Sequence, residues 1–417
     1  MKTPERIEAD YLLETPDDPA RVAAVMAGEQ SSGTFVPVPG ETPQLHARAG
    51  ARVENITPLN MHTTPANPCA MPAPNGYHRA KITLSWPLDN IGADLPNLMA
   101  TVAGNLFELR QVSGLRLLDI RLPDAFSTYS GPQFGIAGTR ALTGVQTGPL
   151  IGTIIKPSVG LSPQETAALA GNLARAGIDF IKDDELQADG PACPFDQRAR
   201  AVMAALNDHA DRTGKRVMYA FNITGEVEQM RRRHDLVRDL GGTCVMVSLN
   251  SIGMAGMLSL SRHSTLPIHA HRNGWGYLSR AGMMGWAYPA WSKLWRLAGA
   301  DHLHVNGLGN KFSEPDDSVM ASVRSLSEPL FAGKPCVAMP VFSSGQTAVQ
   351  AGETYARAGH ADCIYAAGGG IMAHPDGPAA GVASLRAAWE AAIKGIPAAE
   401  YAANHPALQS ALQAYGK

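Results

Sequence analysis

Short apolar runs alternate with longer helical stretches about eight times from residue 150 to the end of the chain. The runs are residues 150–155, 178–181, 217–221, 244–247, 267–270, 302–305, 337–341 and 364–367. Continuous apolar runs of this length are typical of strands that are buried on both faces, as in a parallel sheet covered by helices. Eight such units predict a closed (β/α)8 TIM barrel of the α/β class.

The segment ahead of these repeats has a different rhythm. Alternating apolar positions predict strands, and apolar positions three or four apart predict helices. The predicted order is a strand at 7–13, a helix at 19–28, strands at 49–56 and 80–86, a helix at 95–109 and a strand at 115–122. This β-α-β-β-α-β order is that of an α+β ferredoxin-like domain. We assign residues 1–138 to this domain and residues 139–417 to the barrel, with a Gly/Thr-rich connector at 131–148.

A doubly wound open sheet is the alternative fold for the second domain. A dinucleotide-binding sheet would carry Gly-x-Gly-x-x-Gly after its first strand, and this chain does not. It has instead Ser162-Pro163-Gln164-Glu165, a capping box with proline at the first helical position. We therefore favour the barrel.

Charge and composition exclude several classes of partner. The 417 residues include 35 Lys+Arg and 37 Asp+Glu, with a formal net charge of −2 and neither sign gathered in a tail, so we expect no nucleic-acid or membrane-surface partner. No apolar stretch approaches the length of a membrane span and the N-terminus lacks a secretion signal, so a cytoplasmic enzyme is expected. The five cysteines form no C-x-x-C pair, and Cys244, Cys336 and Cys363 open apolar runs, which predicts buried thiols.

Polar residues follow most of the apolar runs, at the strand ends where a barrel places its active site. They are Lys156 after the first run, Lys182, Asp183, Asp184 and Glu185 after the second, His269, His271 and Arg272 at the fifth, His302 and His304 at the sixth, Ser343, Ser344 and Gly345 after the seventh, and Gly368, Gly369 and Gly370 after the eighth. We expect these residues to converge on one mouth of the barrel.

The run from Lys182 to Glu185 combines three carboxylates with a lysine. Adjacent carboxylates repel one another unless a cation lies among them, and hard oxygen ligands favour Mg²⁺. Burial lowers the pKa of a lysine, and a neutral amine at Lys182 can add carbon dioxide to become a carbamate ligand. A solvated charged turn between strand and helix explains the spacing equally well.

Two further patterns bear on the substrate. His269/His271 and His302/His304 are H-x-H pairs, whose members share a strand face; structural hydrogen bonding is the alternative role for each histidine. Arg272 beside them is suited to a phosphate, although an exposed ion pair is the alternative. The glycine triplet at 368–370, with the Ser-Ser-Gly at 343–345, favours a phosphorylated substrate over a simple tight turn.

The segment Gly177-Ile-Asp-Phe-Ile-Lys-Asp-Asp-Glu185 resembles the RuBisCO segment that carries the carbamylated lysine and the magnesium carboxylates. The resemblance extends over residues 152–157, 160–162, 268–272 and 301–304, Ser343, the glycine triplet with His374 and Pro375, and residues 29–34. It implies an α+β N-terminal domain followed by a barrel, and a homodimer or higher oligomer. Each active site would be completed by the partner's N-terminal domain.

The resemblance also implies a role for each matching residue. Lys182 would carry a CO2-derived carbamate and bind Mg²⁺ with Asp184 and Glu185, and Lys156, Lys182, His271 and Lys311 would be catalytic. Arg272, His304 and Ser343 would hold one phosphate, Thr34, Gly345, Gly368 and Gly369 would form the opposite anion pocket, and Glu29 and Asn105 would come from the neighbouring subunit. His269 and His302 would then be structural.

Departures from the RuBisCO pattern argue against carbon dioxide fixation. Ser158 replaces the second lysine of the I-K-P-K motif, Phe35 replaces a tryptophan, and the loop around Lys311 reads Gly-Asn-Lys-Phe-Ser-Glu. A RuBisCO-like protein fits better. We expect it to form a metal-stabilised enediolate and to decarboxylate, or transfer and hydrolyse the carboxyl group of, 3-oxo-isoapionate 4-phosphate.

Three other functions remain as alternatives. The first is enolisation or isomerisation of a methylthio-ketopentose phosphate in methionine salvage. The second is a metal-dependent amidohydrolase, although such barrels place an H-x-H at the first strand and the lysine on the fourth. The third is a relative with a regulatory or binding role and no catalysis.

Overall fold

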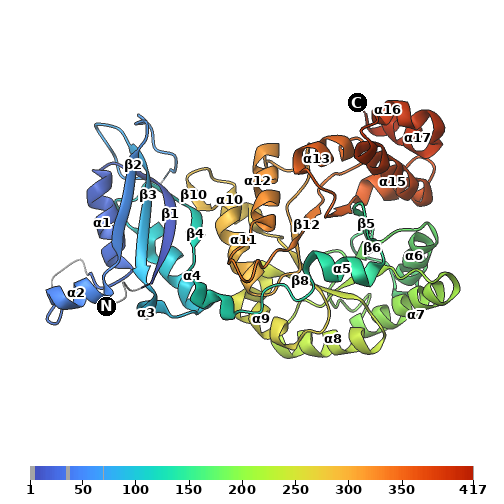
Figure 1. Ribbon diagram of the computed structural model, residues 1–417, viewed down its shortest axis with the longest axis horizontal. Helices are drawn as coiled ribbons and strands as arrows, with labels where there is room; N and C mark the ends of the chain where they lie inside the picture. The colour runs from blue at the N-terminus through green and yellow to red at the C-terminus, as the bar shows by residue number, and fades with distance from the viewer. Residues whose placement is uncertain (1–4, 34–37, 69, 417) are drawn as a thin grey trace. The chain divides into compact units, whose positions relative to one another are not determined.

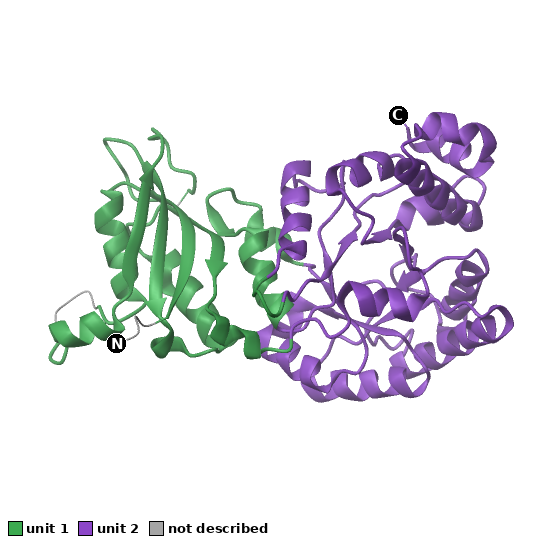
Figure 2. Ribbon diagram, in the orientation of Figure 1, with its two compact units in different colours: residues 1–130, 274–297, 330–334 green, residues 131–273, 298–329, 335–417 purple. Residues whose placement is uncertain are grey.

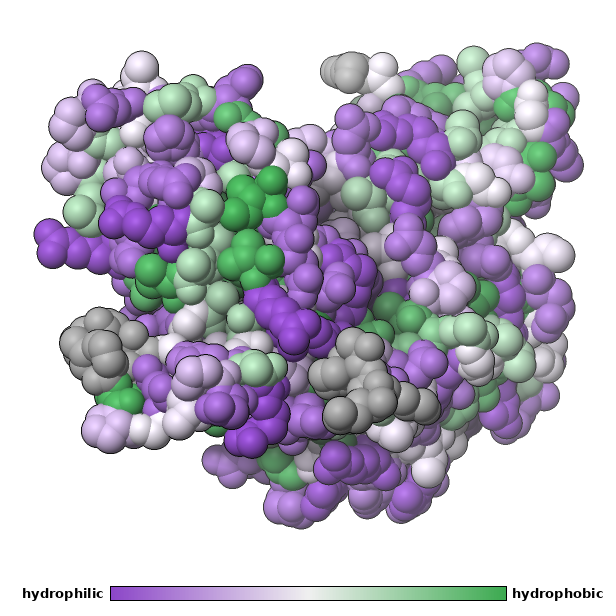
Figure 3. Space-filling view, turned by 60° about the vertical axis from the view of Figure 1, so that its left-hand side comes forward, coloured by the Kyte–Doolittle hydropathy of each residue, from purple (hydrophilic) through white to green (hydrophobic). Residues whose placement is uncertain are grey.

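The computed structural model describes residues 5–33, 38–68 and 70–416, which form two compact units. Unit 1 comprises residues 1–130, 274–297 and 330–334, and unit 2 comprises residues 131–273, 298–329 and 335–417 (Figure 2). In the described residues no helix is both long and apolar enough to span a membrane. On the face in Figure 3 hydrophilic residues predominate, and hydrophobic ones form a few small groups.

Unit 1 is built on a five-stranded sheet with the order β10-β4-β1-β3-β2. Its elements are β1 (Arg6–Thr15), α1 (Pro19–Glu29), α2 (Pro43–Ala49), β2 (Arg52–Pro58), β3 (His78–Pro87), α3 (Leu88–Ile91), α4 (Leu95–Ala103), β4 (Gly114–Arg121), α10 (Trp275–Ser279), β10 (Met284–Trp286) and α11 (Tyr288–Leu297), with 3-10 turns η1 (Asn105–Glu108) and η2 (Asp124–Thr128) (Figure 1). Strand β1 pairs antiparallel with both β3 and β4, so the β4-β1-β3-β2 part has the predicted ferredoxin-like arrangement.

Three details of unit 1 differ from the predicted elements. The helix predicted at 95–109 stops at Ala103, because Gly104 has φ −65° and ψ −120°, outside the helical region, and the chain continues as the 3-10 turn η1. Residues 43–49 form the helix α2, capped by Thr42; its last residue, Ala49, was predicted to begin a strand. Strand β10 joins the sheet beside β4 in parallel, from a segment far along the chain.

Unit 2 is a closed barrel of eight parallel strands in the order β11-β12-β13-β5-β6-β7-β8-β9. The strands are β5 (Leu150–Ile154), β6 (Phe180–Lys182), β7 (Met218–Asn222), β8 (Cys244–Ser248), β9 (Ile268–His271), β11 (His302–His304), β12 (Met339–Phe342) and β13 (Ile364–Ala366). Each overlaps one of the eight predicted apolar runs, so the predicted barrel is confirmed.

Helices surround the barrel strands (Figure 1). They are α5 (Gly135–Thr143), α6 (Pro163–Arg175), α7 (Phe195–Thr213), α8 (Val227–Asp239), α9 (Leu249–His263), α12 (Asp316–Ser327), α13 (Ala351–Ala358), α14 (Gly368–Met372), α15 (Pro378–Lys394), α16 (Ala398–Tyr401) and α17 (Pro406–Tyr415), with η3 (Ala402–Asn404). The predicted capping box at the start of α6 is present, with Ser162 and Glu165 bonding each other's backbone N–H groups.

The interior of the barrel is packed with side chains from its strands. Leu150, Phe180, Met218, Ala220, Cys244, Met246, Met339, Val341, Ile364 and Ala366 form one buried cluster, against which Ile136, Leu142 and Val145 also pack. Burial of each large apolar side chain stabilises the fold by about 1.5–3 kcal/mol. The predicted burial of the thiols of Cys244, Cys336 and Cys363 is confirmed. Because side chains fill the interior of the barrel, a ligand can bind only at the strand ends.

Candidate active site

Asp183 belongs to the packing of the barrel and not to its open mouth. Its side chain is completely buried and accepts hydrogen bonds from the Tyr219 hydroxyl at 2.6 Å and the Asn222 backbone N–H at 2.9 Å. The guanidinium of Arg198, also buried, forms an ion pair with it at 3.2 Å. Asp183 is thus held by buried donors, whereas Asp184, which accepts from the backbone N–H of Leu186 and from Lys156, faces a lysine that is 41% exposed.

Asp184 and Glu185 turn toward positively charged and imidazole groups. Asp184 Oδ2 lies 2.6 Å from Nζ of Lys156, and Glu185 Oε2 lies 3.4 Å from Nζ of Lys182 and 3.5 Å from Nε2 of His271. The amide of Asn222 donates to the backbone oxygens of Asp184 and Glu185 and so holds the turn. The strand-end residues predicted for chemistry therefore meet in one connected set.

Lys182 is the last residue of β6, and its side chain is buried. Burial lowers the pKa of its amine, although the carboxylates of Glu185 and Asp184 act in the opposite direction. The amine donates to the carbonyl oxygen of Asp183 at 2.8 Å, which orients it at the strand end. A lysine whose neutral form is favoured by burial can react with carbon dioxide, so the residue fits the chemistry of a carbamate ligand.

Lys156 and His271 border the two carboxylates from neighbouring strand ends. Lys156 donates to Ser158 Oγ at 2.8 Å as well as to Asp184, and its side chain is 41% exposed, so it is open to a ligand in the mouth. Burial lowers the pKa of His271 to about 4, which makes its imidazole neutral near pH 7. The backbone N–H of Asn273 donates to Nδ1 of His271, leaving Nε2 toward Glu185.

Four buried side chains form a hydrogen-bonded chain inside the barrel, where His269 and His302 also contact the ring of Phe180. His302 Nε2 lies 2.7 Å from Thr139 Oγ1, His302 and His269 are 3.4 Å apart through their Nδ1 atoms, and His269 Nε2 lies 2.8 Å from His304 Nε2. Beyond this chain, Nδ1 of His304 lies 3.1 Å from Ser343 Oγ. His269 and His302 thus make internal contacts, whereas His304 lies at the end next to Ser343.

Arg272 is paired with an acid that the sequence did not indicate. Its Nη2 lies 2.6 Å from Oε2 of Glu314, in the loop after β11. The amide of Asn306 donates to the same oxygen at 2.6 Å, and Ser344 Oγ donates to Asn306 Oδ1 at 2.8 Å. Asn306 follows an apolar strand run, so the strand-end rule could have found it. Nothing in the sequence pairs Glu314 with Arg272.

The glycine-rich loops after β12 and β13 approach each other through their backbones. Gly345 has φ of +94°, and a side chain at Gly370 would come 2.6 Å from the carbonyl oxygen of Gln346, so glycine is required at both positions. Gly368 and Gly369 form the first turn of α14, and a Cβ at Gly368 would lie 3.9 Å from Cε of Lys156. The start of α14 at Gly368 therefore lies near the side chain of Lys156.

The remaining predicted residues are Lys311, which follows β11 and contacts the loop after β12, and three residues of the N-terminal segment. The exposed ammonium of Lys311 lies 5.3 Å from the ring centroid of Phe312, and its backbone N–H donates to Ser344. In unit 1, Nδ2 of Asn105 donates to Glu29 Oε1 at 3.1 Å, so these two predicted residues contact each other. Thr34 lies outside the described residues.

A comparison with protein families matches residues 13–126 to the ribulose bisphosphate carboxylase large chain, N-terminal domain, and residues 135–415 to its catalytic domain. The chain belongs to the RuBisCO large-chain family. Within it, the chain is a RuBisCO-like protein, as the sequence analysis predicted.

Relatives within the RuBisCO family cover nearly the whole chain. The 3-oxo-isoapionate-4-phosphate transcarboxylase/hydrolase of Xanthobacter autotrophicus is 59% identical over 98% of this chain and 99% of its own. The 3-oxo-isoapionate-4-phosphate decarboxylase of Rhizobium etli is 46% identical over 97% of this chain and 98% of its own. The crystal structure of a RuBisCO-like protein from Burkholderia fungorum has a TM-score of 0.93 and 48% identity, covering 98% and 99% of the two chains.

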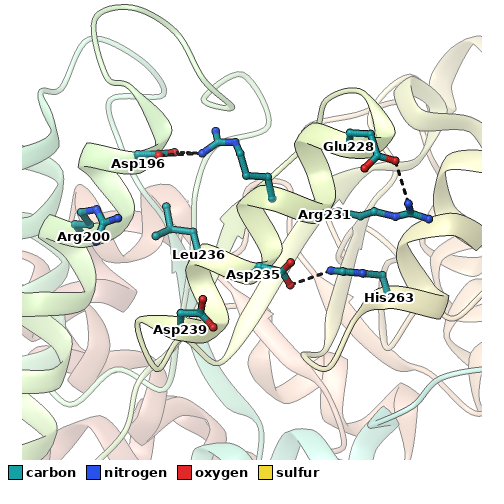
Figure 4. A pocket seen from close by; sticks show the side chains of 9 residues that line it. Asp196, Arg200, Glu228, Arg231, Asp235, Leu236, Asp239 and His263 are labelled. Atoms are coloured by element: carbon teal, nitrogen blue, oxygen red, sulfur yellow. Dashed lines mark hydrogen bonds and ion pairs between the residues drawn. The ribbon is translucent and has the colours of Figure 1, made fainter.

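A hollow of about 660 Å³ on this RuBisCO-like chain lies on the outer helices and not at the mouth (Figure 4). Its residues come from α7, α8 and α9. Two of them, Asp235 and His263, have ligand-type atoms within 4.8 Å of each other and of those of the buried His234. However, the Thr265 N–H donates to Nε2 of His234, so the proton of the neutral ring is on Nδ1, 3.0 Å from Asp235. That ring has no lone pair to offer a metal, and the cluster is best described as structural.

Proposed function

We propose that this protein is a magnesium-dependent enzyme that decarboxylates a phosphorylated β-keto sugar acid, or transfers and hydrolyses its carboxyl group, with 3-oxo-isoapionate 4-phosphate as the substrate. The observation that carries the proposal is the meeting of Lys156, Lys182, Asp184, Glu185 and His271 at the strand ends. The names of the relatives at 59% and 46% identity support the choice of substrate.

The donor set fits Mg²⁺ bound by Asp184, Glu185 and a carbamate on Lys182. The two carboxylates have cationic and imidazole groups around them, whereas Asp183 is occupied by Tyr219 and Arg198. Oxygen ligands of this kind suit Mg²⁺, which keeps coordination positions open for substrate oxygens. When bound, Mg²⁺ would act as a Lewis acid on adjacent carbonyl and hydroxyl oxygens of the substrate.

A residue of the chain would supply the proton that takes the place of the lost carboxyl group. Cleavage of the bond between the carboxyl carbon and its neighbour leaves the electron pair on the sugar as an enediolate, which must then be protonated. Lys156 is held by Ser158 and Asp184 and is partly open to the mouth, so we assign it as the general acid. Lys182, His271 and Lys311 complete the proposed catalytic set, with the neutral imidazole of His271 hydrogen-bonding the substrate.

The two ends of the mouth would hold the polar ends of the substrate. Arg272, His304 and Ser343 form one end, and the backbone N–H groups of Gly345, Gly368 and Gly369 form the other. We further propose a homo-oligomer of at least two subunits, in which Glu29 and Asn105 come from the partner. The mutual contact of Glu29 and Asn105 supports their acting together.

Enolisation or isomerisation of a phosphorylated diketo sugar is the second candidate. Lys156 next to Asp184 and the neutral imidazole of His271 also suit proton transfer without carbon loss. Fixation of carbon dioxide is disfavoured because Ser158 stands where RuBisCO has a second lysine.

The test is a screen of phosphorylated 3-keto sugar acids and diketo sugars with Mg²⁺ and bicarbonate, following carbon dioxide release and proton exchange by NMR. Carbon loss from the keto acid supports the proposal, and proton exchange without carbon loss supports the isomerase. Lys182→Ala should abolish the Mg²⁺-dependent reaction, whereas Lys215→Ala, which removes an ion pair with Asp179 on the same barrel, should retain it. Turnover by Lys182→Ala equal to that of the wild type would contradict the carbamate assignment.

A further inference from the structure

Glu314 compensates the positive charge of Arg272 at one end of the barrel mouth. The two side chains are 14% and 6% exposed, and their charged atoms are 2.6 Å apart. An ion pair so little exposed is weakly screened by salt. Within the set Arg272, Glu314, His304 and Ser343, one cation and one anion therefore cancel, because burial lowers the pKa of His304 well below its usual value.

The carboxylate of Glu314 is fixed in place and is not a mobile surface group. Asn306 Nδ2 donates to Oε2 at 2.6 Å, and Ser318 Oγ donates to Oε1 at 2.9 Å. The amide of Asn310 donates to the backbone oxygen of Glu314 at 3.0 Å, which ties the same loop together. A ligand at Arg272 would therefore meet this carboxylate as part of the site.

A phosphoryl group at this end would place about two negative charges beside the carboxylate of Glu314. The phosphoryl group would be attracted by Arg272 and repelled by Glu314. These two effects would offset each other, because the Glu314 carboxylate is already 2.6 Å from the guanidinium that the phosphoryl group would bind. A hydroxyl group would not incur this repulsion. At the opposite end Lys156, whose Cε is near Gly368, is also paired, with Asp184; that carboxylate is one of the proposed Mg²⁺ ligands, so bound Mg²⁺ would compensate its charge and make this end the better place for a phosphoryl group.

We propose that Glu314 is a specificity-determining residue that restricts the barrel mouth to sugar monophosphates and rejects bisphosphates. It does so by neutralising Arg272, so that the Arg272 end takes an uncharged hydroxyl end of the ligand and the single phosphoryl group goes to the glycine-rich end. This assignment rests on the proposed function, in which the mouth binds a phosphorylated sugar acid, and it adds which phosphorylation pattern is accepted.

The test uses two unreactive polyols, xylitol 5-phosphate and xylitol 1,5-bisphosphate, with binding measured by calorimetry in Mg²⁺. Wild-type enzyme should bind the bisphosphate no more tightly than the monophosphate. Glu314→Gln keeps the shape and an acceptor oxygen for Arg272 and Asn306, and it should tighten bisphosphate binding at least tenfold while changing monophosphate binding less than threefold. Asp317→Asn is the matched control, because it removes the same charge from a side chain that is 97% exposed, and it should change neither affinity.

Several results would overturn the proposal. The proposal is wrong if the wild-type enzyme binds the bisphosphate ten times more tightly than the monophosphate. This result needs no variant, so it does not depend on whether Glu314→Gln folds. Equal gains for both ligands in Glu314→Gln, or no gain, would overturn this proposal alone. Wild-type enzyme that binds neither polyol would overturn the proposed function as well.

Discussion

The hydroxyl of Tyr219 donates a 2.6 Å hydrogen bond to Oδ1 of Asp183, and both side chains are completely buried. Arg198 pairs with the other oxygen of Asp183. Removal of one charge from a buried pair leaves the other uncompensated, at a cost of about 3–5 kcal/mol. We predict that Asp183→Asn lowers the free energy of unfolding by about 3 kcal/mol in urea denaturation. A loss below about 1 kcal/mol would show that Asp183 does not have this structural role.

Asp184→Asn is the matched comparison, one residue along the chain. Asp184 is also buried, but its partner Lys156 is 41% exposed and can be solvated, so its loss should cost less than that of Asp183, about 1–2 kcal/mol. It should weaken Mg²⁺ binding at least tenfold in calorimetry, since a charged oxygen ligand is removed. Unchanged Mg²⁺ binding would contradict its assignment as a ligand.

Asp301 joins the start of α5 to the barrel. Its Oδ1 accepts from the backbone N–H groups of Phe134 and Gly135, and its Oδ2 accepts from that of Ile268. In Asp301→Asn one side-chain oxygen becomes an amide donor facing a backbone donor, and an unsatisfied buried group costs about 1–3 kcal/mol. We predict a loss of about 2 kcal/mol in urea denaturation. Asp208→Asn, an exposed carboxylate on α7, should lose less than about 0.5 kcal/mol, and equal losses would contradict this account.

The buried histidines predict a fall in stability as pH decreases. Burial lowers the pKa of His302 to about 3, and burial together with neighbouring charges lowers those of His269 and His304 well below the ordinary value of 6.5. The unfolded chain therefore takes up protons below pH 6.5 that the folded chain does not. Each histidine then contributes a loss of about 1.4 kcal/mol per pH unit between about pH 6 and 4.

His302→Asn tests this pH dependence, because it removes one of the three groups. The slope of unfolding free energy against pH, measured by urea denaturation between pH 6 and 4, should be shallower by about 1.4 kcal/mol per pH unit than in the wild type. An unchanged slope would show that His302 is not the source of proton uptake.

Local sequence patterns predicted most of the fold. The eight strands of the barrel are continuous apolar runs, and the strand ends carry the polar residues that meet at the mouth. Strand β10 could not be predicted in the sheet of unit 1, because its three residues pair with β4 from a distant part of the chain. The end of α4 at Gly104 depends on the backbone angles of that residue, which the spacing of apolar residues does not predict.

The sequence predicted which residues form the candidate site, but it did not predict the partner with which each side chain is paired. Asp183 and Asp184 are adjacent, and only the packing of Tyr219 and Arg198 distinguishes the structural carboxylate from the one that faces Lys156. Arg272 was predicted as a phosphate ligand, yet Glu314, 42 residues away, compensates its charge. Such pairings form only in the folded barrel, so the local spacing of residues in the sequence does not predict them.

The proposed reaction is tested most directly by the fate of the carboxyl carbon. 3-Oxo-isoapionate 4-phosphate labelled with ¹³C in its carboxyl group would be incubated with the enzyme and Mg²⁺ and followed by ¹³C NMR. We predict that the labelled carbon leaves the sugar phosphate, either as carbon dioxide or in a smaller acid after transfer and hydrolysis, and that Lys182→Ala leaves the substrate intact. A label that stays in an isomer of the substrate, or turnover that is unaffected by Lys182→Ala, would contradict the proposed function.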